Sequence, residues 1–150
     1  MRALVVLLLL ADVAHADRGV HGSAGVGGTF LTSGGRGDRG RLEATLDLSI
    51  RSRYGVLLGW RAFDTTHDGL LTAGLSFEAA AARPRLVIAL HADAGADLDA
   101  RAPLAGAGIR LTVGVLGPLG VVLDGGGYLV IDGDDTRLQI QSSLLLAARW

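Results

Sequence analysis

Alternation of apolar and polar residues along one stretch limits the folds open to this chain more than any other feature. In the sequence RLEATLDLSIRSR, Arg41 to Arg53, aliphatic residues occupy every second position from Leu42 to Ile50, with polar residues between them. Successive side chains of a β-strand point to opposite faces, so the stretch predicts a strand with one apolar and one polar face. Soluble barrels and membrane barrels share this pattern but turn it in opposite directions.

The same period of two continues through the rest of the chain, in segments separated by Gly, Pro, Asp, Ser and Arg. We expect eight strands, near residues 19–32, 41–52, 54–64, 70–82, 85–95, 104–115, 120–131 and 137–150. Their length exceeds the ~5 to 6 residues usual in soluble sheets and approaches the ~9 to 11 that a tilted strand needs to cross a bilayer. The breaks alternate between tight turns and longer or more charged loops, as in outer-membrane barrels. The predicted fold class is all-β, an eight-stranded antiparallel up-and-down transmembrane barrel.

Two stretches, 78–83 (EAAAAR) and 144–150 (LLLAARW), consist largely of residues that favour helices. A short helix at each is the alternative interpretation. Because both stretches keep the alternation of the segments around them, we expect strands there.

The polar faces are poor surfaces for water, since that of the sixth segment combines Arg110 and Thr112 with glycines. Small side chains instead suit the narrow lumen of an eight-stranded barrel. The opposite face, from Ala105 to Val115, carries no charge, as lipid requires, because an arginine near the bilayer midplane costs about 2 to 4 kcal/mol. A dry soluble core would look the same. A soluble periplasmic barrel that binds an apolar ligand is therefore the alternative function.

The first residues have the features of an export signal. Residues 1–16 begin with Arg2, continue with an apolar run and end in the cleavage-site pattern Ala14-His15-Ala16, which predicts a signal peptide followed by a barrel domain at 17–150. The chain has no cysteine, and its arginines are dispersed at a net charge of −1. A nucleic-acid partner is not expected, because such binding needs a basic surface.

The end of the chain carries a further pattern. Apolar residues at alternate positions, among them Leu144 and Leu146, lead to a terminal Trp150. This resembles the C-terminal signature of bacterial outer-membrane proteins, although Ser142 and Ala148 depart from it. The resemblance implies recognition of this strand by the barrel-assembly machinery.

The whole mature chain resembles the small eight-stranded bacterial outer-membrane barrels of the OmpA and OmpX type. The resemblance implies a location in the bacterial outer membrane, in contact with its lipid, and we expect a monomer. Aromatic residues should lie at both membrane interfaces. Tyr54 and Trp150 suit the periplasmic rim and Phe30 the outer rim, whereas Trp60 and Phe77 fall nearer the middle of their segments.

Charged residues on the polar faces form the candidate site. If these faces line the lumen, eight charges point inward: Glu43, Asp47, Arg51, Arg61, Glu78, Asp93, Arg110 and Asp124. Unpaired charges in a narrow space of low dielectric are costly, so we expect them to pair.

Counting across the hairpins gives two expected clusters. The first places Asp47 near Arg61, with Glu78 as a third partner. The second places Arg110 near Asp124, with Asp93 close by. We expect the two clusters to plug the barrel, so that it is not a pore. The alternative is that these side chains reach solvent at the barrel ends and pair weakly.

Histidine and serine residues give no firm catalytic or metal site. His21 and His91 are expected on inward faces far apart, so no pair has metal-ligand spacing and no metal or cofactor is predicted. His21-Gly22-Ser23 resembles the His-x-Ser of outer-membrane lipid A deacylases, in which histidine activates serine. Here Ala24 stands where that family has asparagine, and both side chains would face the lumen. We predict no catalytic residues and a structural or surface-interaction role, with a lipid-modifying enzyme as the second alternative.

Overall fold

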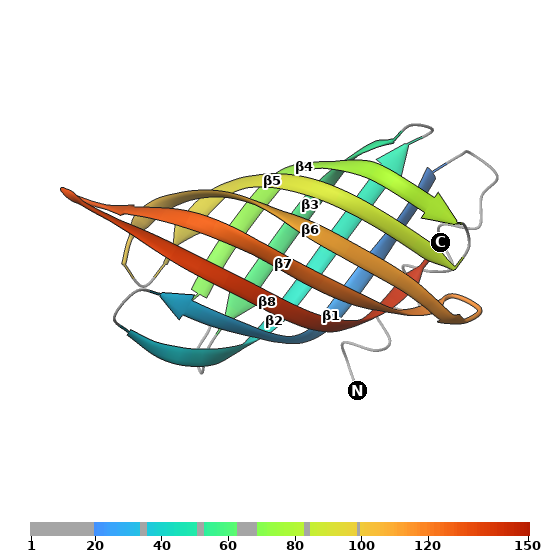
Figure 1. The fold of residues 1–150 in the computed structure, drawn as a ribbon, viewed down its shortest axis with the longest axis horizontal. Helices are drawn as coiled ribbons and strands as arrows, with labels where there is room; N and C mark the ends of the chain where they lie inside the picture. The colour runs from blue at the N-terminus through green and yellow to red at the C-terminus, as the bar shows by residue number, and fades with distance from the viewer. Residues whose placement is uncertain (1–19, 34–35, 51–52, 63–68, 83–84, 99) are drawn as a thin grey trace.

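The chain forms a closed barrel of eight antiparallel strands (Figure 1). The computed structural model describes residues 20–33, 36–50, 53–62, 69–82, 85–98 and 100–150. The strands are β1 (Val20–Ser33), β2 (Arg36–Ile50), β3 (Tyr54–Ala62), β4 (Gly69–Ala82), β5 (Leu86–Asp97), β6 (Ala102–Leu116), β7 (Leu119–Asp132) and β8 (Asp135–Arg149).

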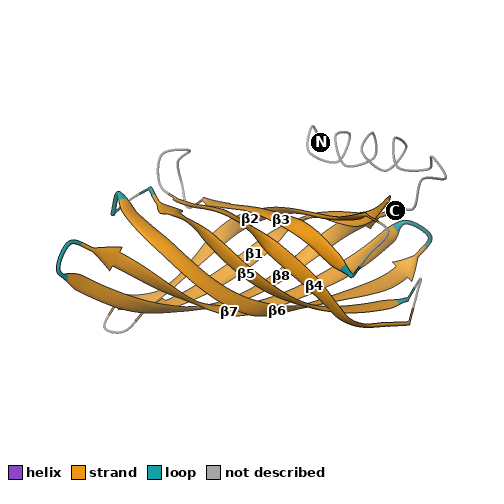
Figure 2. Cartoon of the chain, turned by 90° about the horizontal axis from the view of Figure 1, so that it is seen from above, coloured by secondary structure: helices purple, strands orange, loops and turns teal. Residues whose placement is uncertain are grey.

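Each strand pairs with the next one along the chain, and β1 pairs with β8 to close the sheet. The strands run obliquely to the long axis of the barrel (Figure 2), as closure of a sheet requires. The predicted all-β, eight-stranded, antiparallel up-and-down barrel is confirmed. The predicted signal peptide, residues 1–16, lies outside the described residues. The described part of the chain contains no helix long and apolar enough to cross a membrane.

Both helix-favouring stretches belong to strands where they are described. Residues 78–82 complete β4, and β8 continues to Arg149. A shift in register between Glu78 and Ala80 lets β4 run on beside β5. Cross-strand pairing therefore overrides local helix propensity at both places.

The barrel has two distinct ends. The turn end carries the β2–β3, β4–β5 and β6–β7 connections together with the start of β1 and the end of β8, and the loop end carries the other four connections. Two of the loops expected there, near 33–40 and 132–136, are largely strand, because β2 begins at Arg36 and β8 at Asp135. Gly133, with φ of 62°, allows the tight β7–β8 turn. This hairpin reaches farthest at the loop end (Figure 1).

Aliphatic side chains cover the outside of the barrel. They remain exposed even at mid-strand positions, with Leu75 at 70% and Ile109 at 56%. Exposed charged side chains, among residues whose burial is described, lie at strand ends and connections: Arg53, Arg85, Arg101, Asp132, Asp134 and Asp135. The soluble-barrel alternative required the aliphatic faces to point inward, and they point outward. The exterior is thus a surface suited to lipid rather than to water.

Of the two aromatic residues expected near the middle of their segments, Trp60 lies closer to a barrel end. Phe77 is directly opposite Tyr54, and their ring centroids are 5.2 Å apart. Phe77 nevertheless stays near the middle of β4, which continues to Ala82. Trp60 lies close to the loop end, because β3 already ends at Ala62. The expected position near the middle of the segment is therefore wrong for Trp60 and not for Phe77.

A charge placed on the outer face tests its contact with lipid. Ile109 lies near the middle of β6, so Ile109→Arg should lower the free energy of unfolding in phospholipid vesicles by about 2 to 4 kcal/mol. Urea titration measures this difference. Thr136→Arg, at the exposed β7–β8 tip, is the matched control and should change stability little. Equal stability of both variants would contradict a lipid-facing exterior.

Candidate functional site in the barrel lumen

A connected set of polar side chains crosses the middle of the lumen. Arg110 donates from Nε to Asp124 Oδ2 over 2.8 Å. The ring of His91 lies between two carboxylates, with Nε2 at 3.1 Å from Asp124 Oδ1 and Nδ1 at 3.0 Å from Asp93 Oδ2. The Tyr128 hydroxyl donates a hydrogen bond to the same Asp93 oxygen over 2.8 Å. Strands β5, β6 and β7 are thereby tied together through their inward faces.

Arg61 joins this set from β3. Its Nη2 donates to the Tyr128 hydroxyl over 3.4 Å, and its Nη1 donates to Thr72 Oγ1 over 3.3 Å. The guanidinium carbon also lies 5.4 Å from the centroid of the Tyr128 ring, within cation–π range. We call Arg61, His91, Asp93, Arg110, Asp124 and Tyr128 the central network. Each of these residues is at most 5% exposed.

Two inward-facing glycines of β6 make room for the central network. A side chain on Gly106 would meet the ring of Tyr128, and one on Gly108 would meet the ring of His91. In register, Gly106 lies between Asp93 of β5 and Tyr128 of β7. Side chains from β5 and β7 can therefore meet over β6. Part of the high glycine content thus serves packing inside a narrow barrel.

Apolar side chains pack together on the loop-end side of the network. Leu70, Ala102, Leu104 and Val130 pack with Tyr128 in one buried cluster. On the other side, Val122, Leu145 and Ala147 form a second cluster. The central network thus lies between two buried apolar clusters.

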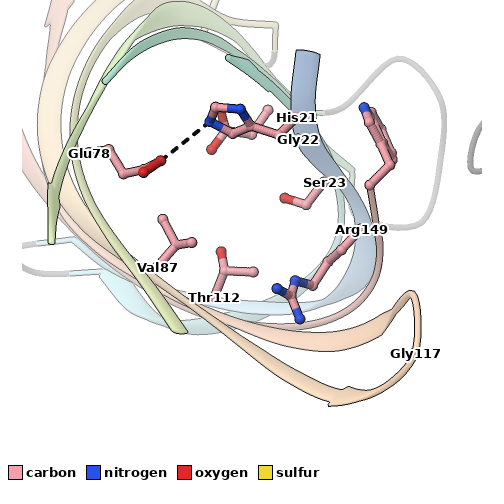
Figure 3. A pocket seen from close by; sticks show the side chains of 10 residues that line it. His21, Gly22, Ser23, Glu78, Val87, Thr112, Gly117 and Arg149 are labelled. Carbon is pink, nitrogen blue, oxygen red and sulfur yellow. Dashed lines mark ion pairs between the residues drawn. The ribbon is translucent and has the colours of Figure 1, made fainter. Parts of the chain in front are cut away.

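A cavity of about 290 Å³ lies at the turn end (Figure 3). We call it the terminal cavity; its lining includes His21, Ser23, Asp47, Glu78, Val87, Thr112 and Arg149. His21 Nε2 lies 3.4 Å from Glu78 Oε2, which joins β1 to β4 across the cavity. Asp47 accepts a hydrogen bond from Ser76 Oγ over 3.1 Å.

The structure brings together the charges of the second expected cluster and not those of the first. The structure brings Arg110 and Asp124 together and links Asp93 to them through His91. The Glu43 side chain and all of Arg51 lie outside the described residues.

The expected grouping of Asp47, Arg61 and Glu78 is wrong. Asp47 is opposite Leu57 in the β2–β3 register, whereas Arg61 is opposite Glu43. Four residues separate these positions, about 13 Å along a strand. Arg61 belongs to the central network, and Glu78 faces His21.

The sequence did not indicate that two residues, His91 and Tyr128, belong to the central network. His91 and Asp93 are two apart on one inward face, and this spacing lets their side chains meet. Tyr128 could be recognised only from the register that places it beside Gly106. No group of three or more His, Asp or Glu residues in the described part of the chain is placed to hold a metal ion.

Comparison with solved structures gives the fold. The structure of Ail, the attachment invasion locus protein of Yersinia pestis, in complex with the heparin analogue sucrose octasulfate, matches with a TM-score of 0.52 at 13% identity, covering 89% of this chain and 99% of that one. A second structure of Ail matches over the same shares with a TM-score of 0.49, also at 13% identity. This chain has the fold of the small eight-stranded outer-membrane barrels. No protein-family model and no curated protein sequence matches it.

Removal of one charge tests how strongly the central network holds the barrel. Asp124→Asn leaves Arg110 and His91 without their shared carboxylate, so the free energy of unfolding should fall by about 3 to 5 kcal/mol. Reversible urea unfolding in vesicles measures the change. Asp132→Asn, at the exposed β7–β8 tip, removes the same charge and should cost under about 1 kcal/mol. A similar small loss in both variants would contradict a structural role for the network.

Proposed function

We propose that this chain is a bacterial outer-membrane barrel that acts through its exposed surface, and that it is neither a pore nor an enzyme. The observation that carries this proposal is the combination of an aliphatic exterior with a lumen crossed by a buried charged network. Lipid would cover the aliphatic exterior. The lumen holds paired charges and apolar clusters where an open channel would need a continuous polar passage.

The surface role is proposed on two grounds. Ail is described as an attachment and invasion protein, and one of its structures contains a heparin analogue. In this chain the β7–β8 hairpin reaches farthest at the loop end (Figure 1) and exposes Asp132, Asp134 and Asp135. Carboxylates repel sulfated polyanions, so a partner at this hairpin should be cationic, unlike the ligand of Ail.

The route to the membrane is also proposed. Residues 1–16 would direct export and be removed. The last strand would be read by the barrel-assembly machinery: Leu144 and Leu146 are exposed on the outer face, at 58% and 71%. Trp150 exchanges two backbone hydrogen bonds with Gly22 of β1, which would complete closure. We propose a monomer, because closure of the barrel leaves no long unpaired edge.

The enzyme alternative has less support. His21 and Ser23 both line the terminal cavity, so neither faces the lipid that a deacylase would cleave.

Cell fractionation tests the proposed location. The expressed protein should be recovered with outer membranes, require detergent for extraction, and migrate faster on a gel before heating than after, as folded barrels do. A water-soluble protein recovered from the periplasm would overturn the proposal. The variant Ile109→Arg should reduce the heat-modifiable fraction, whereas Thr136→Arg should not.

Conductance of single barrels tests the plugged lumen. In planar bilayers the protein should give no stable open-channel steps, because the central network and the apolar clusters occupy the lumen. A porin incorporated into the same bilayers shows that steps would be detected. Steady conductance steps from the heat-modifiable form would contradict the plug while leaving the membrane location standing.

A further inference from the structure

Asp47 is the charge in the terminal cavity that the rest of the structure does not account for. Among the described side chains, Ser76 Oγ donates a hydrogen bond to Asp47 Oδ1 over 3.1 Å. No cationic side chain of the described residues lies within ion-pair distance of it. Glu78, its neighbour in the cavity, faces His21. Asp47 is thus a partly buried carboxylate that borders open space.

The nearby arginine does not form an ion pair with Asp47. Arg110 interacts electrostatically with Asp47 at longer range, but its Nε is bonded to Asp124. A partly buried carboxylate is stabilised when a cation with hydrogen-bond donors reaches it. The cavity beside Asp47 has the space for such a cation.

The other lining groups indicate what kind of cation fits. Ser23 and Thr112 contribute hydroxyl groups to the cavity, and Val87 an aliphatic wall (Figure 3). Hydroxyl oxygens accept hydrogen bonds from the N–H groups of an ammonium ion, and an aliphatic wall packs against methylene groups. A bare metal ion would need more ligands, and no group of three or more His, Asp or Glu residues in the described part of the chain is placed to hold one.

We propose that the terminal cavity binds a small organic ammonium compound, with Asp47 as its counter-ion. The ammonium group donates to the free oxygen of Asp47 and to the hydroxyls of Ser23 and Thr112, while a short alkyl chain contacts Val87. At about 290 Å³ the cavity is at the lower limit of small-molecule sites, which restricts the ligand to a short-chain amine. Entry is from the turn end.

This binding site does not rest on the proposed surface role. It depends on the lumen of the folded barrel and lies at the end opposite the β7–β8 hairpin. A protein without any surface partner would still have the cavity, and loss of ammonium binding would leave the membrane location and the surface role untouched.

Titration of the detergent-solubilised, heat-modifiable protein tests the proposal. n-Butylammonium should give saturable changes in the backbone amide NMR signals of the residues around the cavity, whereas the neutral probe butan-1-ol should bind at least about tenfold more weakly. Asp47→Asn, which keeps the size of the side chain, should weaken butylammonium binding by about tenfold or more. Asp132→Asn removes a carboxylate at the opposite end and should leave binding unchanged.

A second variant keeps the test decisive if Asp47→Asn does not fold. Thr112→Val preserves shape and leaves Asp47 in place, and should weaken butylammonium binding several-fold without a comparable effect on butan-1-ol. The absence of saturable binding, equal affinity for the two probes, or unchanged affinity in Asp47→Asn would each overturn the proposal.

Discussion

The exclusion of charge from the lipid-facing surface is the constraint on which the rest of this structure depends. A charged side chain near the middle of that surface would cost several kcal/mol, and the exposed charges of the described residues lie at strand ends and connections. Charges within the strands therefore turn inward. An eight-stranded barrel has a narrow lumen, so these charges must neutralise one another over short distances. The central network is the result.

Neutralisation in so narrow a space depends on small residues as much as on charges. The rings of His91 and Tyr128 have room to meet above β6 because that strand presents Gly106 and Gly108 between them. Apolar clusters on both sides of the network raise the cost of leaving any of its charges unpaired. The terminal cavity differs, since Asp47 borders open space there rather than a packed layer. The central network and the terminal cavity thus occupy different levels of the lumen.

Charge pairing across a hairpin could be predicted from the sequence between β6 and β7 but not between β2 and β3. Arg110 and Asp124 flank the tight turn at Gly117 and Pro118, and they are directly opposite in register. Between β2 and β3 the register instead pairs Arg61 with Glu43 and leaves Asp47 opposite Leu57. An error of four residues in counting across such a turn moves a charge about 13 Å.

The sequence by itself determined the number of strands, their up-and-down order and which side chains share a face, because side-chain direction in a strand depends only on the parity of position. It also indicated which face meets lipid, since one face lacks charge. Tertiary structure alone decided which charges meet. Closure of β1 on β8 and the stagger between strands place His91, Arg61 and Tyr128 at one level of the lumen and Asp47 at another. Contacts across a lumen depend on the curvature and stagger of the whole sheet, which no local pattern encodes.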